Sequence, residues 1–575
     1  MRKMILILLV LVAAGLLTKY VITKIHRFYT LDDLQTSWPQ QVLGVYNRST
    51  NSIIFNNDSV LHYTLNWVNN AEKSLPEKSI KLLIEQKLPI FFNLQIWSGK
   101  LISKLDKPVL NAIVTGDFDV KLIAFFKLLD KSKTTIYLRC NAEMEMPLYN
   151  KYPWQNQGAT LYIISFRHVA LLCKKYSPSV KIVWGPSGYP GSEEYWPGNE
   201  YVDINSVNID TAKEIKNDPY PSYSSVEEMM RLKLFRMRFM NKPVYFLSSA
   251  SVTRASFKNQ WLNELNNKLI ADKNIYQSTI IPFESDTAAI KKVRDTNLKI
   301  GVYDPRLKLI NQPLITIEHI FTDMKSVENG LFKKQFNAVI DRKHDVIVTI
   351  EPWKDNSKER DSAILNNTVL GKYDKIWSKL YQEISNIPQT VYLRWGHEME
   401  IPVDRYPWQK QDPVSYIKAF KYFATFQPSK ATNIKIVWGP AGDRGSVEWW
   451  PGEDVVDFVS IAIYGLPDKN INDYNKQQSF TSIFQNKFHR LRFAHRPIFI
   501  TEFGVKGPED YKMKWLKDAA ETINKYPEIK GVCYFNFADT PKAWGNAETP
   551  DWSITPLTFK SFTALLNDLP KTNAQ

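Results

Sequence analysis

The feature of this sequence that most limits its fold is an internal repeat whose period is the length of a domain. Tyr137–Trp154 reads YLRCNAEMEMPLYNKYPW, and Tyr392–Trp408, about 254 residues further along, reads YLRWGHEMEIPVDRYPW. Ile182–Asp203 (IVWGPSGYPGSEEYWPGNEYVD) and Ile436–Asp457 (IVWGPAGDRGSVEWWPGEDVVD) form a second pair at a similar distance. This period far exceeds the ~20–50 residues of a solenoid repeat. Each copy is therefore expected to fold as an independent domain.

The two copies correspond almost from end to end. Near the end of each copy, Pro243–Ser251 (PVYFLSSAS) corresponds to Pro497–Val505 (PIFITEFGV). Residues 280–298, between the copies, contain no Gly/Ser-rich linker, so the joint is expected to be short. We interpret the pattern as a tandem duplication. The predicted parts are an N-terminal segment of residues 1–28 and domains at residues 29–285 and 298–575.

Composition excludes several classes of protein. With 44% hydrophobic and 13% aromatic residues among 575, the chain is globular rather than disordered. The net charge is +15, but there is no arginine-rich run or zinc-finger spacing, so we expect a solvated basic surface and no nucleic-acid partner. The 17 Trp and 28 Tyr residues suit either core packing or platforms on which sugars stack.

The N-terminus carries a hydrophobic signal or anchor. Met4–Leu17 is an apolar run after two basic residues, shorter than the roughly 20 residues of a membrane span. Thr18–Arg27 contains no small-x-small cleavage site, and Tyr20, Val21 and Ile22 prolong the apolar stretch. We favour a retained anchor over a cleaved signal peptide. Either would place both domains outside the cytoplasm, membrane-anchored, secreted or periplasmic.

Short apolar runs alternate with segments of helical spacing in each copy. In the second copy Tyr373–Ile384 and Ser415–Phe426 have helical spacing. Continuously apolar strands between helices indicate a parallel sheet covered on both faces. Roughly eight such units per copy predict an α/β chain of two tandem (β/α)₈ TIM barrels, with a doubly wound open sheet as the alternative. The runs predicted as strands include Asp345–Ile350, Thr390–Arg394, Ile434–Trp438, Phe458–Tyr464, Pro497–Thr501 and Lys530–Phe535.

Acidic and aromatic residues gather at the predicted strand ends of the second copy, where barrels carry their function. A single Glu there is usually a helix cap or a solvated loop residue, but several strand ends share the feature. Glu398 and Glu502 end the predicted fourth and seventh strands. Two carboxyl groups across a barrel mouth suit glycoside hydrolysis, one donating a proton and one attacking the anomeric carbon. The residues are Glu351, Trp353, His397, Glu398, Trp438, Tyr464, Glu502 and Asn536.

A series of short motifs spans most of residues 300–555. They are Gly371-x-Tyr373-Asp374, Arg394-x-Gly396-His397-Glu398-Met399, Tyr406-Pro407-Trp408, Val437-Trp438-x-Pro440, Trp450-Pro451-Gly452-x-Asp454 and Ile500-Thr501-Glu502-Phe503-Gly504. In these motifs the second copy resembles glycoside hydrolase family 26, the β-mannanase family of the large retaining (β/α)₈ clan. The resemblance implies a retaining endo-β-glycanase, with Glu398 as general acid/base and Glu502 as nucleophile.

The resemblance also implies a set of substrate-binding residues and no cofactor. His397 would line the site of the reacting sugar, Tyr464 would hydrogen-bond to the nucleophile, and Trp353 and Trp438 would stack on or border the sugar. Arg394 and Trp408, from the same motifs, complete the predicted binding set. No metal is expected, because His397 would be a lone ligand.

One position departs from the family pattern. Glu400 and Ile401 follow the His-Glu-Met motif, where the family usually has Asn and Gly. The added charge is expected to change contacts on the leaving-group side. A β-1,4-linked, β-mannan-like polysaccharide is the favoured substrate, with mixed-linkage β-glucan, β-1,3-xylan and a self-made exopolysaccharide left open.

The first copy has lost much of this set. Glu143 matches Glu398, but Ala142, Asp210 and Ser248 replace His397, Tyr464 and Glu502 respectively. Without a nucleophile the first domain is predicted to be non-catalytic. Its tryptophans could bind sugar or simply pack loops; they are Trp97, Trp154, Trp184 and Trp196.

Two further expectations remain. The alternative to an enzyme is a non-catalytic polysaccharide-binding or scaffolding protein of an envelope or exopolysaccharide system. The three cysteines, Cys140, Cys173 and Cys533, make no disulfide framework, although Cys140 and Cys173 could pair.

Overall fold

The computed structural model describes the chain in two compact units, one within residues 35–289 and one that includes residues 290–575. The predicted N-terminal segment, Trp97 and Asp210 lie outside the described residues. None of the described helices combines the length and apolarity that a membrane span requires. The described residues are 42–47, 52–53, 60–67, 75–85, 88–96, 108–147, 152–155, 157–209, 218–220, 223, 225–240, 242–248, 298–354, 361–426, 431–466, 478–540 and 548–567.

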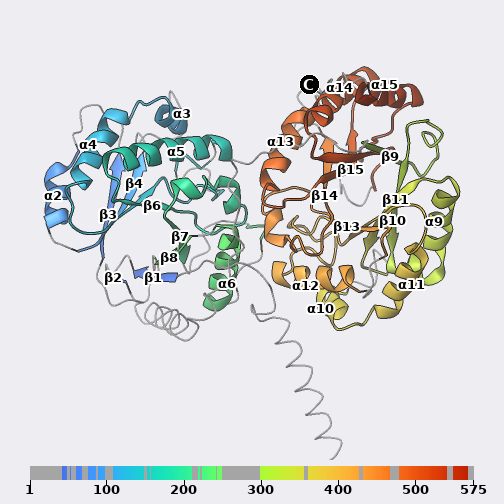
Figure 1. The fold of residues 1–575 in the computed structure, drawn as a ribbon, viewed down its shortest axis with the longest axis horizontal. Helices are drawn as coiled ribbons and strands as arrows, with labels where there is room; N and C mark the ends of the chain where they lie inside the picture. Colours follow the sequence, from blue (N-terminus) through green and yellow to red (C-terminus); the bar gives the residue numbers. More distant parts are fainter. Residues whose placement is uncertain are drawn as a thin grey trace, which may run out of the picture. The chain divides into compact units, whose positions relative to one another are not determined.

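The second unit is a closed barrel of eight parallel strands (Figure 1). Each strand pairs with the next along the chain, and β16 closes the ring by pairing with β9. These strands overlap all six apolar runs predicted above, so the barrel expected for this half is confirmed. The strands are β9 (Lys299–Tyr303), β10 (Ile317–Asp323), β11 (Asp345–Glu351), β12 (Val391–Trp395), β13 (Ile434–Trp438), β14 (Phe458–Gly465), β15 (Ile498–Val505) and β16 (Ile529–Phe535).

Helices surround the barrel and bury one apolar face each (Figure 1). In α11, for example, Ile376, Trp377 and Leu380 are buried at helical spacing. At the start of α12, Asp412 accepts a hydrogen bond from the Ser415 amide, an N-cap that fixes where the helix begins. The helices are α8 (Met324–Asn329), α9 (Leu331–Asp341), α10 (Ile364–Val369), α11 (Asp374–Ile384), α12 (Pro413–Ala424), α13 (Phe480–Arg490), α14 (Glu509–Lys525) and α15 (Pro556–Asn567).

Side chains from six of the eight barrel strands form a hydrophobic cluster in the centre of the barrel. One layer consists of Ile317, Ile347, Tyr392, Val437, Phe499 and Cys533, all buried. This packed interior leaves the ends of the strands as the place where polar side chains can meet a substrate.

The first unit has a related sheet that is not closed among the described residues. Its order is β2-β1-β8-β7-β6-β5-β4-β3, and only the β1–β2 pair is antiparallel. The strands are β1 (Val42–Asn47), β2 (Ser52–Ile53), β3 (Leu61–Trp67), β4 (Ile90–Ile96), β5 (Ile136–Cys140), β6 (Lys181–Trp184), β7 (Ile204–Ile209) and β8 (Val244–Ser248). The described helices are α2 (Glu77–Glu85), α3 (Val109–Val114), α4 (Asp119–Leu129), α5 (Ala159–Tyr176) and α6 (Val226–Arg236).

The prediction of a second eight-stranded barrel therefore needs correction for the part of the first unit that the structure describes. Seven parallel strands match β9 to β15, but β1 pairs directly with β8, where β16 intervenes in the second unit. The segment in which an eighth strand would fall, residues 249–297, lies outside the described residues. Among the described strands β1 and β3 do not pair, so the described sheet is open between them.

Candidate active site

The predicted nucleophile Glu502 lies on β15 with both carboxylate oxygens held. Arg394 Nη1, from β12, forms an ion pair with Glu502 Oε1. The Tyr464 hydroxyl, at the end of β14, donates to Glu502 Oε2 over 3.1 Å. The hydrogen bond expected between Tyr464 and Glu502 is thus present. Two donors on one carboxylate fix its orientation in the mouth of the barrel.

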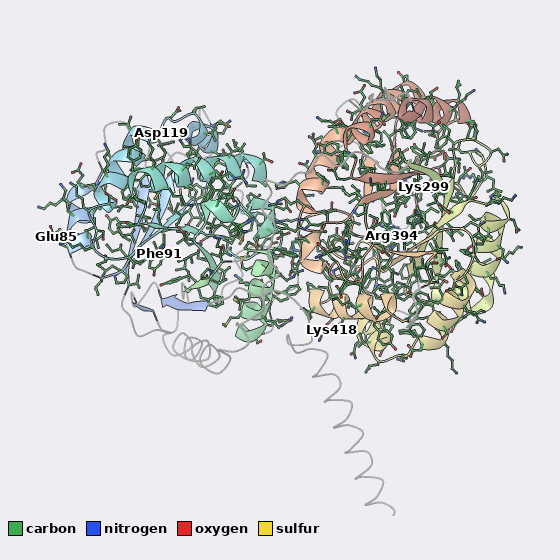
Figure 2. The ribbon with its side chains drawn as sticks, in the orientation of Figure 1. Glu85, Phe91, Asp119, Lys299, Arg394 and Lys418 are labelled. Carbon is green, nitrogen blue, oxygen red and sulfur yellow. The ribbon has the colours of Figure 1, made fainter. Side chains whose placement is uncertain are left out.

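Arg394, predicted as a substrate-binding residue, is paired with the predicted nucleophile. Its side chain has no exposed surface, and it lies within the barrel of the second unit (Figure 2). Its partner is Glu502, and its role is to hold that carboxylate in place.

Two residues without a predicted role support this ion pair. Arg394 Nη1 also lies 3.4 Å from the Thr349 hydroxyl oxygen, and His319 Nε2 lies 2.8 Å from the same oxygen. His319 Nδ1 is 3.2 Å from the carbonyl oxygen of Thr501, which can only accept, so the ring proton belongs on Nδ1. Burial, with the Arg394 charge adding to it, holds the pKa of His319 well below its usual value. The neutral ring then accepts from Thr349 while Thr349 accepts from Arg394.

The predicted acid Glu398 has an unusual backbone conformation. Its φ is +54° and that of Gly396 is +56°, both in the left-handed region. The Glu398 amide donates to the Gly439 carbonyl over 2.8 Å, and its own carbonyl accepts from Gln409 Nε2 over 2.9 Å. Left-handed backbone at a residue other than glycine is held by its surroundings and occurs often at functional sites.

Burial, followed by the negative charge of Glu502, raises the pKa of Glu398 to about 7. This is the direction expected of a general acid, because both effects penalise the charged carboxylate. Arg405 and Arg394 oppose the rise, so the carboxyl remains able to lose its proton. The group can therefore donate a proton and take one back near neutral pH.

A third carboxyl group, Glu351 at the end of β11, joins the site. Its Oε2 accepts a hydrogen bond from Trp353 Nε1 over 3.0 Å, and its Oε1 lies 4.0 Å from His397 Nε2. Burial raises the pKa of Glu351 to about 7. Burial and the charges of Arg394 and Arg405 hold the pKa of His397 well below its usual value. His397 was predicted to line the site of the reacting sugar, whereas the sequence assigned no specific role to Glu351.

The tryptophans predicted to bind substrate, of which Trp353 and Trp438 were expected to stack on or border the sugar, differ in exposure. Trp408 and Trp438 have no exposed surface, so neither ring offers a face to a sugar. Trp408 Nε1 donates to the His397 carbonyl over 2.7 Å, and its ring stacks on Tyr406 with centroids 4.5 Å apart. Trp353 is 8% exposed and is the one of the three that borders the cleft. The two buried rings pack within the protein and help to hold the site residues in place.

Glu400 also has a different role from the one expected. It is buried, and its Oε1 accepts hydrogen bonds from the Gly442 and Asp443 amides over 2.9 and 3.1 Å and from the Ser446 hydroxyl over 2.7 Å. In the first unit Glu145 accepts from two amides of the matching loop in the same way. Through these hydrogen bonds Glu400 anchors the loop after β13.

The first unit keeps the support of the acid but not the nucleophile. Trp154 Nε1 donates to the Ala142 carbonyl over 2.8 Å, as Trp408 Nε1 does to the His397 carbonyl. Glu143 has a φ of +59°, close to that of Glu398. Trp154, Trp184 and Trp196 are buried, which favours loop packing over sugar stacking. Ser248 ends β8, but its side chain lies outside the described residues.

Asn208 occupies the space next to Arg139 in the first unit. Its Oδ1 accepts from Arg139 Nη2 over 3.0 Å, and its Nδ2 donates to Glu143 Oε1 over 2.7 Å. Strand register places Asn208 where the second unit has Ala462. A neutral amide thus bridges two charged groups that flank the position of a nucleophile in the second unit.

No family model matches this chain. It is similar to Endoglucanase H of Acetivibrio thermocellus, 26% identical over 232 residues that cover 38% of this chain and 23% of that protein. It is also similar to Beta-1,3-xylanase of Alcaligenes sp., 24% identical over 171 residues that cover 28% of this chain and 33% of the xylanase. Both relatives are glycoside hydrolases, and the chain spans no more than a third of either.

Among solved structures, the GH26 beta-mannanase from Bacteroides ovatus matches with a TM-score of 0.36 and 12% identity. The match covers 48% of this chain and 90% of the mannanase.

The part of the chain that the structure describes contains neither a disulfide nor a cluster of metal ligands. Cys140, Cys173 and Cys533 are buried and free, so the disulfide considered between Cys140 and Cys173 is not formed. Within the described ranges no group of three or more His, Cys, Asp or Glu side chains could hold a metal ion.

Proposed function

We propose that the second unit is a retaining endo-β-glycanase in which Glu502 is the nucleophile and Glu398 the general acid/base. The observation that carries the proposal is the contrast between the two carboxyl groups. Glu502 is held by Arg394 and Tyr464, whereas burial and the Glu502 charge raise the pKa of Glu398 to about 7. One group suited to attack and one suited to proton donation are what the double-displacement mechanism requires.

In the first step a Glu502 oxygen bonds to the anomeric carbon as the glycosidic C–O bond breaks. Glu398 gives its proton to the departing oxygen, which leaves a glycosyl-enzyme ester and a Glu398 carboxylate. That carboxylate then takes a proton from water, the water oxygen attacks the anomeric carbon, and Glu502 is released ionised. Arg394 and Tyr464 steady Glu502 as its charge is lost and regained.

The substrate we favour is a β-1,4-linked, β-mannan-like polysaccharide, on the motifs shared with glycoside hydrolase family 26. Because two relatives are named an endoglucanase and a β-1,3-xylanase, glucan and xylan are the other candidate substrates. Incubating the full chain with soluble mannan, mixed-linkage glucan and β-1,3-xylan and measuring new reducing ends tests the proposal. No cleavage of any β-glycan would favour the polysaccharide-binding alternative.

Replacing the acid gives a sharper test. Glu398→Gln is expected to lower kcat/KM on natural glycans by ~10²–10⁴-fold, but much less on aryl glycosides whose phenol leaves without protonation. In the wild type, kcat/KM on natural glycans should fall as the pH rises through about 7, because Glu398 then loses the proton it must donate. Kinetics across pH 5–9 measure both effects. An alkaline fall that persists in Glu398→Gln would belong to another group, such as Glu351.

We also propose that the chain arose by tandem duplication, that the first unit is non-catalytic, and that residues 1–28 direct export. The bridging amide of Asn208 supports the second point, since it occupies Glu143 with a neutral donor. Glu143→Gln is therefore expected to leave kcat and KM of the full chain within about twofold, well under the 1.4 kcal/mol of a tenfold change. A tenfold loss would show that the first unit takes part in catalysis.

A further inference from the structure

Glu351 has one carboxylate oxygen engaged and one available. Trp353 Nε1 holds Oε2, and among the described residues no group donates a hydrogen bond to Oε1. The side chain is 19% exposed at the mouth of the barrel. The charged groups that face it are Arg405, Asp323 and Glu502. The free oxygen is therefore an acceptor on a partly exposed side chain close to His397.

His397 offers the complementary donor. Its side chain is almost wholly buried, and its Nδ1 has no hydrogen-bond partner among the described residues. Burial keeps the ring neutral, so it carries one N–H. We assign that proton to Nε2, the nitrogen that faces Glu351 Oε1 across 4.0 Å.

A separation of 4.0 Å is too long for a direct hydrogen bond but fits one bridging oxygen. An oxygen about 2.8 Å from each atom would subtend an angle of about 90° between them. When Glu351 is ionised, this oxygen would donate to the carboxylate and accept from the imidazole N–H, and an alcohol hydroxyl does both. An anion would be repelled by Glu351, and an ammonium group could accept nothing from His397.

We propose that Glu351 and His397 together bind one hydroxyl group of the sugar held against the catalytic carboxyl groups, and that this contact selects among β-glycans. The inference rests on the proposed glycosidase function and adds a specificity residue to it. The first unit carries Gln95 and Ala142 at the corresponding positions, so the pair is absent where the nucleophile is also absent. A hydroxyl placed differently on the ring would leave the Glu351 oxygen desolvated and unpaired.

The test compares Glu351→Gln with the wild type in the full chain, on aryl β-glycosides of the sugar that the wild type cleaves and on their monodeoxy derivatives. On the parent glycoside the variant should lose about 10- to 100-fold in kcat/KM, the range for a hydrogen bond to a charged group. One deoxy position should cost the wild type a similar factor. On that derivative Glu351→Gln should add less than about a twofold loss, because the hydroxyl it binds is already missing.

Equal losses from Glu351→Gln on the parent and on every deoxy derivative would overturn the inference, since an indirect effect on folding or charge is blind to one hydroxyl. Thermal unfolding measures whether Glu351→Gln still folds. If it does not, Glu351→Asp, which keeps the charge but moves the carboxylate away from the bound hydroxyl, should show the same dependence on one hydroxyl. Gln95→Glu in the first unit is the matched control and should change nothing. Wild-type cleavage without this coupling rejects only the inference; no cleavage of any β-glycoside rejects the proposed function and the inference with it.

Discussion

Glu502→Gln is expected to lower kcat on β-glycans by on the order of 10⁴-fold or more, because the reaction loses the atom that attacks the anomeric carbon. The fold should survive the change, since the amide is nearly the same shape and its oxygen can still accept from Arg394. Reducing-end assays at high enzyme concentration measure the residual rate. A variant that still unfolds cooperatively, at a temperature above that of the assay, would separate a chemical defect from a structural one.

Two further measurements identify the nucleophile itself. A 2-fluoro glycoside carrying an activated leaving group should trap the wild type as an ester on the peptide that contains Glu502. Glu502→Ala with added azide should form an α-glycosyl azide, because the azide attacks from the face that the carboxylate has vacated. Near-wild-type turnover in Glu502→Gln, or a trapped ester on another peptide, would contradict the assignment.

Glu502→Ser is expected to destabilise the second unit by about 3–5 kcal/mol, the effect of removing one partner from a buried ion pair. Arg394 is fully buried, so the variant leaves its charge inside the barrel without its carboxylate. The first unit already has Ser248 and Asn208 at the matching positions, and there the amide oxygen accepts from Arg139. Adding Ala462→Asn to Glu502→Ser should therefore recover roughly 1.5–3 kcal/mol, the value of a hydrogen bond to a charged group.

Calorimetry of the full chain measures this effect, since the two units need not unfold together. The transition that moves in Glu502→Ser should move back in the double variant, while activity stays absent in both. Asn208→Ala is the matched control and should lower the other transition. A double variant no more stable than Glu502→Ser would show that Asn208 does not compensate for a lost carboxylate.

The barrel of the second unit and the two carboxyl groups of the proposed chemistry could both be predicted from the sequence alone. Both depend on local patterns: apolar runs between helical segments indicate parallel strands, and a Glu at the end of such a run lies at the barrel mouth wherever the helices pack. The repeat added the comparison that singled out Ser248 as the loss of a nucleophile. The same pattern predicted eight strands in the first unit. There β1 pairs directly with β8, because the pairing of strands depends on contacts between distant segments and not on local sequence.

The partners and the exposure of the other site residues depend on tertiary packing and could not be predicted from the sequence. Arg394 and Glu502 are 108 residues apart, and nothing local indicates that the arginine turns to the carboxylate rather than to a sugar. Trp408 and Trp438 lie in motifs typical of sugar binding, yet surrounding rings leave them no exposed face. The 4.0 Å gap between Glu351 and His397 likewise exists only once β11 and β12 lie side by side. Whether a side chain is buried, and which group it pairs with, depends on residues from distant parts of the chain. A periodic sequence pattern contains no information about those contacts.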